Sequence, residues 1–174
     1  MKSFKEHIFE KLKVSVRNTT KHTLFPKTKG ELHEMIRDEI SKNGNECSLN
    51  HIDVSRITDM SRLFYDSKFN GDISDWNVSK VENMDGMFDS AKFNGDISNW
   101  DVSNVTNMTN TFFKSKFNGD ISNWDVSNVA IMAQMFLGSA FDGDISNWDV
   151  SSVKNMWRMF DDSPLENNPP KWYK

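Results

Sequence analysis

The 174-residue chain contains a single cysteine, Cys47, and no apolar run of 18 residues. One cysteine cannot form an intrachain disulfide, which mildly favours a reducing compartment. Without a long apolar run, no transmembrane segment is expected. Residues 1–7 lack the apolar core of a secretory signal. We therefore expect a cytoplasmic or virion-associated protein, or a cell-surface protein if a leader has been removed.

Clustered positive charge is also missing. Residues 1–46 hold 10 Lys+Arg against 7 Asp+Glu, a charge of +3, and the remaining 128 residues hold 11 against 18, a charge of −7. Binding to phosphates requires clustered basic residues, so nucleic acid is not an expected partner. The four histidines are scattered, Cys47 has no obvious histidine partner, and Gly-rich phosphate loops are absent. We expect no enzymatic activity and no cofactor.

The sequence does contain an internal repeat, which is the most informative feature of a chain of this kind. A string of the type Asn-Gly-Asp-Ile-Ser recurs at a spacing of 24 residues without insertions. Its copies span residues 70–79, 94–103, 118–127 and 142–151. Upstream, a degenerate copy has Ile52 in the tryptophan position, and downstream Trp172 follows two prolines. Atypical end copies are typical of solenoids, so we expect about five coils between residues 47 and 174.

Each unit combines two apolar patterns. Phe69, Ile73 and their equivalents, separated by Asn-Gly, indicate a short strand with a bend. Apolar residues at steps of three, three and one, as in residues 81–88, indicate one face of about two helical turns. A serine stands where the helix N-cap is expected, and residues 79–82 read as a full capping box. The serines are Ser55, Ser79, Ser103, Ser127 and Ser151.

Stacking of these units is expected because one unit cannot bury its own apolar side. Like residues would then superpose about 4.8 Å apart in the strand layer. The tryptophan column would contain Trp76, Trp100, Trp124, Trp148 and Trp172. The phenylalanine columns would contain Phe64, Phe88, Phe112, Phe136 and Phe160, and Phe69, Phe93, Phe117 and Phe141. The predicted fold is an α/β repeat solenoid, leucine-rich-repeat-like, with one short strand and one short helix per coil and parallel stacking.

The opening segment differs from the repeat. We assign residues 1–46 to an N-terminal helical cap or leader and residues 47–174 to the repeat. Apolar spacing predicts a small amphipathic helix over 3–13. Residues 28–31 form a capping box that opens a second helix, and Asn-Gly at 43–44 is a plausible stop. The apolar face of this second helix, which we expect to cover the first coil, contains Leu32, Met35, Ile36 and Ile40.

The run Phe-Asn-Gly-Asp-Ile-Ser-Asn-Trp-Asp-Val-Ser-Asn-Val-Thr-Asn-Met at 93–108 resembles the repeat of the BspA-like leucine-rich-repeat surface proteins. These occur in mycoplasma lipoproteins, in many other bacteria, in some protists and in bacteriophages. The resemblance spans residues 47–163 and depends on the Trp-Asp-Val-Ser and Met-Phe elements. It implies a leucine-rich-repeat-like solenoid without enzymatic activity. Named members of that family act as adhesins toward host matrix proteins or other cells.

A column of carboxylates is the one candidate metal site. It contains Asp72, Asp96, Asp120 and Asp144. Calcium needs six to eight oxygen ligands, which each coil would supply from the Asp, a neighbouring Asn and backbone carbonyls. The alternative is that these side chains bond the turn backbone of the adjacent coil. A second column, at positions 53, 77, 101, 125 and 149, alternates Asp with Asn, which backbone bonding tolerates and ligation does not. We prefer the backbone role and predict no metal site.

The positions that break the repeat are the candidate partner-binding residues. They are Tyr65, Phe113, Ile131, Leu137, Trp157 and Arg158. If the helix face is as assigned, an exposed apolar stripe crosses the last three coils and contains Phe113, Ile131, Leu137 and Trp157. Apolar patches with aromatic anchors are typical of protein interfaces. The alternative is that the opening helices cover these side chains or that they pack locally.

The sequence therefore predicts a non-enzymatic interaction module with adhesin-like recognition of a protein or glycan partner through the outward variable face. The alternative function is structural. In that case the chain is an accessory virion protein of a bacteriophage, and its basic N-terminal segment is the docking leader.

Overall fold

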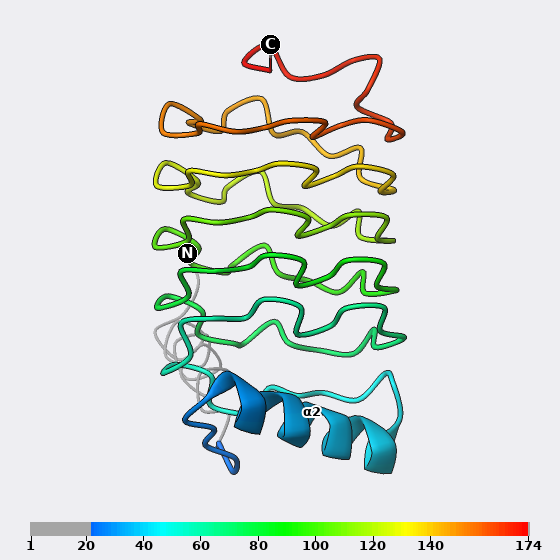
Figure 1. The fold of residues 1–174 in the computed structure, drawn as a ribbon. Helices are drawn as coiled ribbons and strands as arrows, with labels where there is room; N and C mark the ends of the chain where they lie inside the picture. The colour runs from blue at the N-terminus through cyan, green and yellow to red at the C-terminus, as the bar shows by residue number, and fades with distance from the viewer. Residues whose placement is uncertain (1–21, 174) are drawn as a thin grey trace, which may run out of the picture.

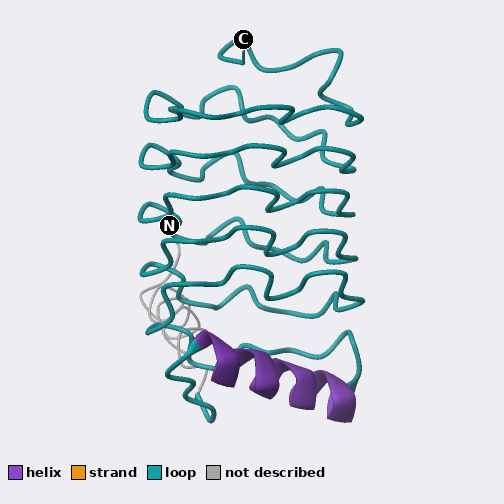
Figure 2. Cartoon of the chain, in the orientation of Figure 1, coloured by secondary structure: helices purple, strands orange, loops and turns teal. Residues whose placement is uncertain are grey.

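The computed structural model describes residues 22–173. The chain winds into a column of stacked layers, with one helix at the N-terminal end and the C-terminus at the opposite end (Figure 1). Within the described residues the single helix is α2 (Lys29–Asn43), and all other segments are loops and turns (Figure 2). The helix predicted over 3–13 lies outside the described residues. No described helix has the length and hydropathy needed to cross a membrane.

Helix α2 is bounded by the local signals that the sequence carries. The Thr28 side chain accepts a hydrogen bond from the Glu31 N–H at 3.2 Å, as an N-cap does. The Glu31 carboxylate in turn accepts from the Lys27 N–H at 2.7 Å, one residue before the cap. At the other end Gly44 has φ 84° and donates its N–H to Ile40 O at 2.8 Å. The predicted start and stop of this helix are confirmed.

The apolar side of α2 covers the first coil. Leu32 and Ile36 are 0% and 3% exposed and belong to the same apolar core as the coils, while Met35 and Ile40 pack at its edge. This arrangement closes the N-terminal end of the stack, so that the first coil does not present its apolar cross-section to water. The predicted position of this helix over the first coil is confirmed.

The coils themselves contain neither of the two elements that the repeat pattern predicted. Within residues 22–173, pairing between coils consists of isolated parallel bridges, with no strand and no sheet. The longest series joins Asp59 with Asn83, Asn83 with Asn107, Asn107 with Ile131 and Ile131 with Asn155. Because these coils have no helix and no strand, the prediction of an α/β repeat solenoid is wrong. The coils are stacked, but they are built from turns.

Backbone hydrogen bonds in the segment predicted as a helix explain why no helix forms there. In the first coil the Leu63 N–H donates to Met60 O at 3.2 Å, closing a turn, whereas the Arg62 N–H donates to Asp85 O of the next coil at 2.9 Å. Turns closed between residues i and i+3 return an apolar side chain inward every three residues, which imitates helical spacing. Positive φ, which interrupts helical geometry, recurs at Arg62, Asp66, Gly86, Ser90, Asn110, Lys114, Gln134, Gly138, Arg158 and Asp162.

The segment predicted as a strand is joined to its neighbours by side chains. The Asn94 N–H donates to Asn70 Oδ1 at 2.8 Å, and the equivalent bond to Asn94 Oδ1 in the next coil is 2.7 Å long. A ladder of asparagine amides therefore adds to a small number of backbone bonds between the coils, such as the bond from the Lys92 N–H to Ser67 O at 2.9 Å. The adjacent glycine is required by a close approach in the first of these coils, because a Cβ on Gly71 would lie 1.9 Å from Cys47 O.

The serines predicted as helix N-caps close Asx turns instead. The Ser79 N–H donates to Asn77 Oδ1 at 3.1 Å, and the Ser103 N–H donates to Asp101 Oδ1 at 3.1 Å. The side-chain oxygen two residues upstream satisfies the serine N–H, so no helix begins there. Asp and Asn both occur at the position two residues before the serine. Either side chain provides the oxygen that accepts the serine N–H, so the bond does not need a charged acceptor.

The interior consists of the predicted columns of identical side chains. Trp76 and Trp100 stack with ring centroids 6.4 Å apart and planes 6° apart, and Phe88 and Phe112 stack at 5.6 Å. Each indole also donates to the carbonyl 27 residues upstream, for example from Trp124 Nε1 to Ile97 O at 3.1 Å. The tryptophan therefore fills the core and satisfies its polar atom at the same time. The superposition predicted from the 24-residue spacing is confirmed.

Candidate interaction surface

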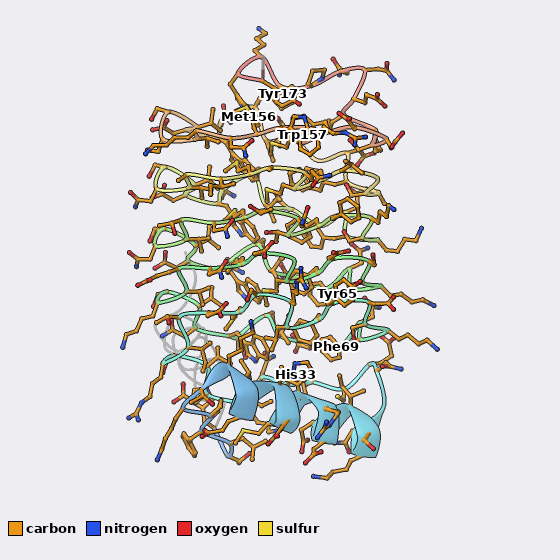
Figure 3. The ribbon with its side chains drawn as sticks, viewed as in Figure 1. His33, Tyr65, Phe69, Met156, Trp157 and Tyr173 are labelled. Atoms are coloured by element: carbon orange, nitrogen blue, oxygen red, sulfur yellow. The ribbon has the colours of Figure 1, made fainter. Side chains whose placement is uncertain are left out.

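The outward side of the turn segments carries the positions that differ between coils. We call this surface the variable face. It comprises segments 61–66, 85–90, 109–114, 133–138 and 157–162, together with Ile131. The tight turns direct the fixed side chains inward and leave the intervening side chains on the outside. Tyr65 in the first coil and Trp157 in the last mark its two ends (Figure 3).

The exposure of the predicted partner-binding side chains is uneven. Trp157 is 61% exposed, Tyr65 55% and Ile131 37%, whereas Phe113 is half-buried. Leu137 is only 5% exposed, so the expectation of a continuous exposed stripe is wrong at this residue. Leu137 has a coil on either side that covers its short side chain, whereas Tyr65 has a coil on one side only. The exposed aromatics are therefore separate anchors near the two ends of the face.

A basic side chain lies over an aromatic ring in alternate coils. The distances from the charged group to the ring centroid are 5.9 Å for Arg62 and Tyr65, 5.0 Å for Lys114 and Phe113, and 5.5 Å for Arg158 and Trp157. Such cation–π contacts contribute about 0.5–1 kcal/mol at exposed sites and limit the motion of both side chains. Three aromatic side chains of the variable face are thus each packed against a basic side chain of the same coil.

The middle of the variable face contains a hydrogen-bond acceptor without a donor. Asn110 Oδ1 is buried, and within the described part of the chain it has no hydrogen-bond partner. The backbone of Asn110 is left-handed, with φ 54°, a conformation that asparagine adopts more readily than most residues. Unsatisfied buried polar atoms are rare in folded proteins, because burying an acceptor without a hydrogen bond costs free energy. A donor from a ligand or a water molecule would remove that cost. The repeat pattern contained no signal for this atom.

The carboxylate column is occupied by backbone hydrogen bonds. Asp96 Oδ1 accepts from the Ser98 N–H at 2.9 Å, and Asp120 Oδ1 accepts from the Ser122 N–H at 2.9 Å. These donors lower the pKa of both carboxyls below the ordinary value of 3.8. The bonds lie within one coil, not between adjacent coils as expected. Among the described residues, no group of three or more His, Cys, Asp or Glu side chains could hold a metal ion.

Among the described residues, Cys47 and His51 both lie near Glu39 of α2. Cys47 is half-buried, and burial raises the pKa of its thiol above the ordinary value of 9.0, which lowers its thiolate fraction at neutral pH. His51 Nε2 lies 3.4 Å from Glu39 Oε2, at the junction of α2 and the first coils. These groups lie near the closed N-terminal end of the stack, away from Trp157.

Comparison with known proteins places the chain in a family but does not assign a function. The family model described as "Mycoplasma protein of unknown function, DUF285" matches residues 31–136 and, in a second match, residues 92–173. A search of curated proteins returned no match, and neither did a search of solved structures. The finer assignment to BspA-like leucine-rich-repeat proteins is not confirmed. Because the two matches together cover most of its length, the chain belongs to the DUF285 family of mycoplasma-type proteins of unknown function.

Proposed function

We propose that this chain is a non-enzymatic, adhesin-like recognition module that binds a protein partner through its variable face. In this proposal, one set of residues in each coil stabilises the stack and another set binds the partner. The fixed columns hold the stack together, and the exposed variable positions, such as Tyr65 and Trp157, are free to differ because the core does not depend on them. The support comes from the exposed side chains on that face.

The observation that carries the proposal is the contrast between Trp157 and the other tryptophans. Trp157 is 61% exposed, whereas Trp148, the nearest member of the tryptophan column, is 5% exposed and bonded to Ile121 O. At the register of Trp157 the other coils carry smaller side chains: Ser61, Asp85, Thr109 and Ala133. A large exposed aromatic gives the stack no burial, but it is the residue type that most often dominates the energy of a protein interface.

The surroundings of Trp157 also suit a protein partner. The Arg158 guanidinium lies over the indole and forms an ion pair with Asp161, with Nε 2.6 Å from Oδ2. An aromatic anchor rimmed by paired charges is the usual composition of a transient interface, where the rim supplies specificity and the anchor supplies affinity.

Site-specific crosslinking tests the proposal. A photoreactive benzophenone amino acid replaces Trp157 in the full chain, and in a matched control it replaces Lys80, an exposed residue outside the variable face. Both chains are expressed in the native cells, irradiated and analysed by mass spectrometry. We expect a crosslinked protein from position 157 that is absent from position 80. The proposal fails if both positions give the same products, or if position 157 gives none.

A further inference from the structure

A small pocket with both apolar and polar lining residues lies at the N-terminal end of the variable face, between α2 and the first coil. Its volume is about 200 Å³, and its floor is formed by Ile36 and Ile40 from α2 and by Leu63 and Phe64 from the first coil. Small-molecule sites usually have about 300–1,000 Å³. This pocket is smaller and therefore suits a single apolar side chain supplied by a larger partner.

The rim of the pocket is basic. His33 and Arg37 from α2 and Tyr65 from the coil line it, and Figure 3 shows His33 and Tyr65 on the same side of the molecule. Arg62 adds a second guanidinium, 5.9 Å from the Tyr65 ring centroid. Both arginines are exposed, and neither forms an ion pair with another residue of the described range. Two exposed guanidinium groups beside one pocket, one on α2 and one on the first coil, favour a ligand with carboxylates.

Backbone acceptors complete the site. In the second coil Met87 O and Asp89 O accept hydrogen bonds of 2.9 and 2.8 Å from the first coil. The equivalent oxygens of the first coil are Leu63 O and Tyr65 O, and within residues 22–173 they accept none. Helix α2 covers the end of the stack without donating to them. Edge acceptors of this kind pair with the N–H groups of an extended peptide in strand addition.

We infer that this pocket is a subsite for an extended segment of the protein partner that carries one apolar side chain flanked by Asp or Glu. The apolar side chain enters the space between Ile40 and Leu63, a peptide N–H donates to Leu63 O or Tyr65 O, and the carboxylate meets Arg37. This inference depends on the proposed function, because it names the kind of partner segment that the N-terminal end of the variable face binds.

Selection from a random-peptide display library on the immobilised full chain is the first test. We expect enrichment of sequences with one large aliphatic or aromatic residue next to Asp or Glu. The enriched peptide is then synthesised with a fluorophore, and its binding is measured by polarisation. Replacing its apolar residue by Ser, or its acids by Asn or Gln, should weaken binding by about tenfold each. Enrichment of peptides without this pattern, or no enrichment, overturns the inference.

Variants of the chain locate the site. Arg37→Glu should weaken the peptide by about tenfold, whereas Arg56→Glu, the same charge change outside the pocket, should change it less than about twofold. Ile40→Trp fills the pocket and should also abolish binding, with the helical signal in circular dichroism as the check on folding. Equal effects of Arg37→Glu and Arg56→Glu overturn the inference. If the photoreactive residue at position 157 still crosslinks a partner in that case, the proposed function stands without this subsite.

Discussion

The interior columns and the variable face contain the same kinds of side chain in opposite environments. Phe112 is fully buried in a column, whereas its neighbour Phe113 is half-buried under Lys114. Trp148 is 5% exposed and Trp157 is 61% exposed. The difference follows register and not residue type: the tryptophan and phenylalanine side chains that recur every 24 residues are core, whereas Trp157, the single aromatic side chain at its register, lies on the surface. Departures from the repeat that are also exposed, such as Tyr65 and Trp157, therefore carry the proposed function.

The first prediction tests the comparison at adjacent residues. Phe112→Ala removes a ring from the middle of a stacked column and should lower the free energy of unfolding by about 3–5 kcal/mol. Phe113→Ala removes a half-buried ring and should cost clearly less. Urea denaturation followed by circular dichroism measures both. Equal costs would show that the column is not the main source of stability.

The second prediction concerns a fixed position without a side chain. Gly71→Ala places a Cβ against Cys47 O, which must move, and it should cost about 1–3 kcal/mol. Gly30→Ala is the matched control, because the new Cβ on α2 has no neighbour closer than 3.9 Å and alanine favours helix by about 1 kcal/mol. The melting temperature should fall for the first variant and stay level or rise for the second. A tolerated Gly71→Ala contradicts the close approach of these coils.

The third prediction uses the Asx turns. The Ser98 N–H lowers the pKa of Asp96 below 3.8, and the same cause acts on Asp120 and Asp144. A folded-state pKa below the unfolded value means that ionisation stabilises the fold. This stabilisation is complete above the unfolded pKa and is lost as pH falls through the folded pKa. The melting temperature should therefore be flat near neutral pH and fall below about pH 4.

A matched variant isolates the turn carboxylates from other effects of acid. Asp96→Asn keeps the Oδ1 acceptor, as Asn77 does at another turn, but it cannot titrate. The variant should lose less stability than the parent between pH 5 and pH 2.5, a range of about 2.5 pH units chosen to span the carboxyl transition. An identical acid profile would show that these carboxyls do not contribute to acid sensitivity.

The smallest stability effect is expected on the variable face. Trp157→Asp should change the free energy of unfolding by no more than about 0.5 kcal/mol, because the side chain is mostly exposed. The same variant should abolish capture of the crosslinked partner. A large fall in the melting temperature would instead place Trp157 in the core and remove the basis for the proposed function.

Some parts of the fold could be predicted from the sequence because their causes are local. Helix α2 begins at Thr28 and stops at Gly44, and both signals act within a few residues. The columns could be predicted because a constant 24-residue spacing leaves few other ways to bury Trp76 and its equivalents. The internal structure of the coil could not be predicted. The N–H of Arg62 bonds to the next coil instead of its own, and hydrophobic spacing contains no information about that choice.

Some residues of the candidate site could also be predicted from the sequence, and others could not. Tyr65 and Trp157 could be predicted as surface positions because they break the repeat, and both are exposed. The burial of Leu137 and the isolated oxygen of Asn110 depend on neighbouring coils, and the pocket beside Tyr65 depends on where α2 lies. Contacts between distant segments of this kind leave no periodic pattern in the sequence.

Hydrogen exchange of the tryptophan indoles tests the central claim, that repeated side chains superpose in closed columns. The indoles of Trp76, Trp100, Trp124 and Trp148 donate to buried carbonyls, whereas within the described residues the Trp157 indole has no acceptor. In a ¹H–¹⁵N spectrum after transfer to D₂O, these four indole signals should persist, the signal of the partly buried Trp172 should decay more slowly than that of Trp157, and the Trp157 signal should vanish at once. Similar exchange rates for all the indoles would contradict the columns.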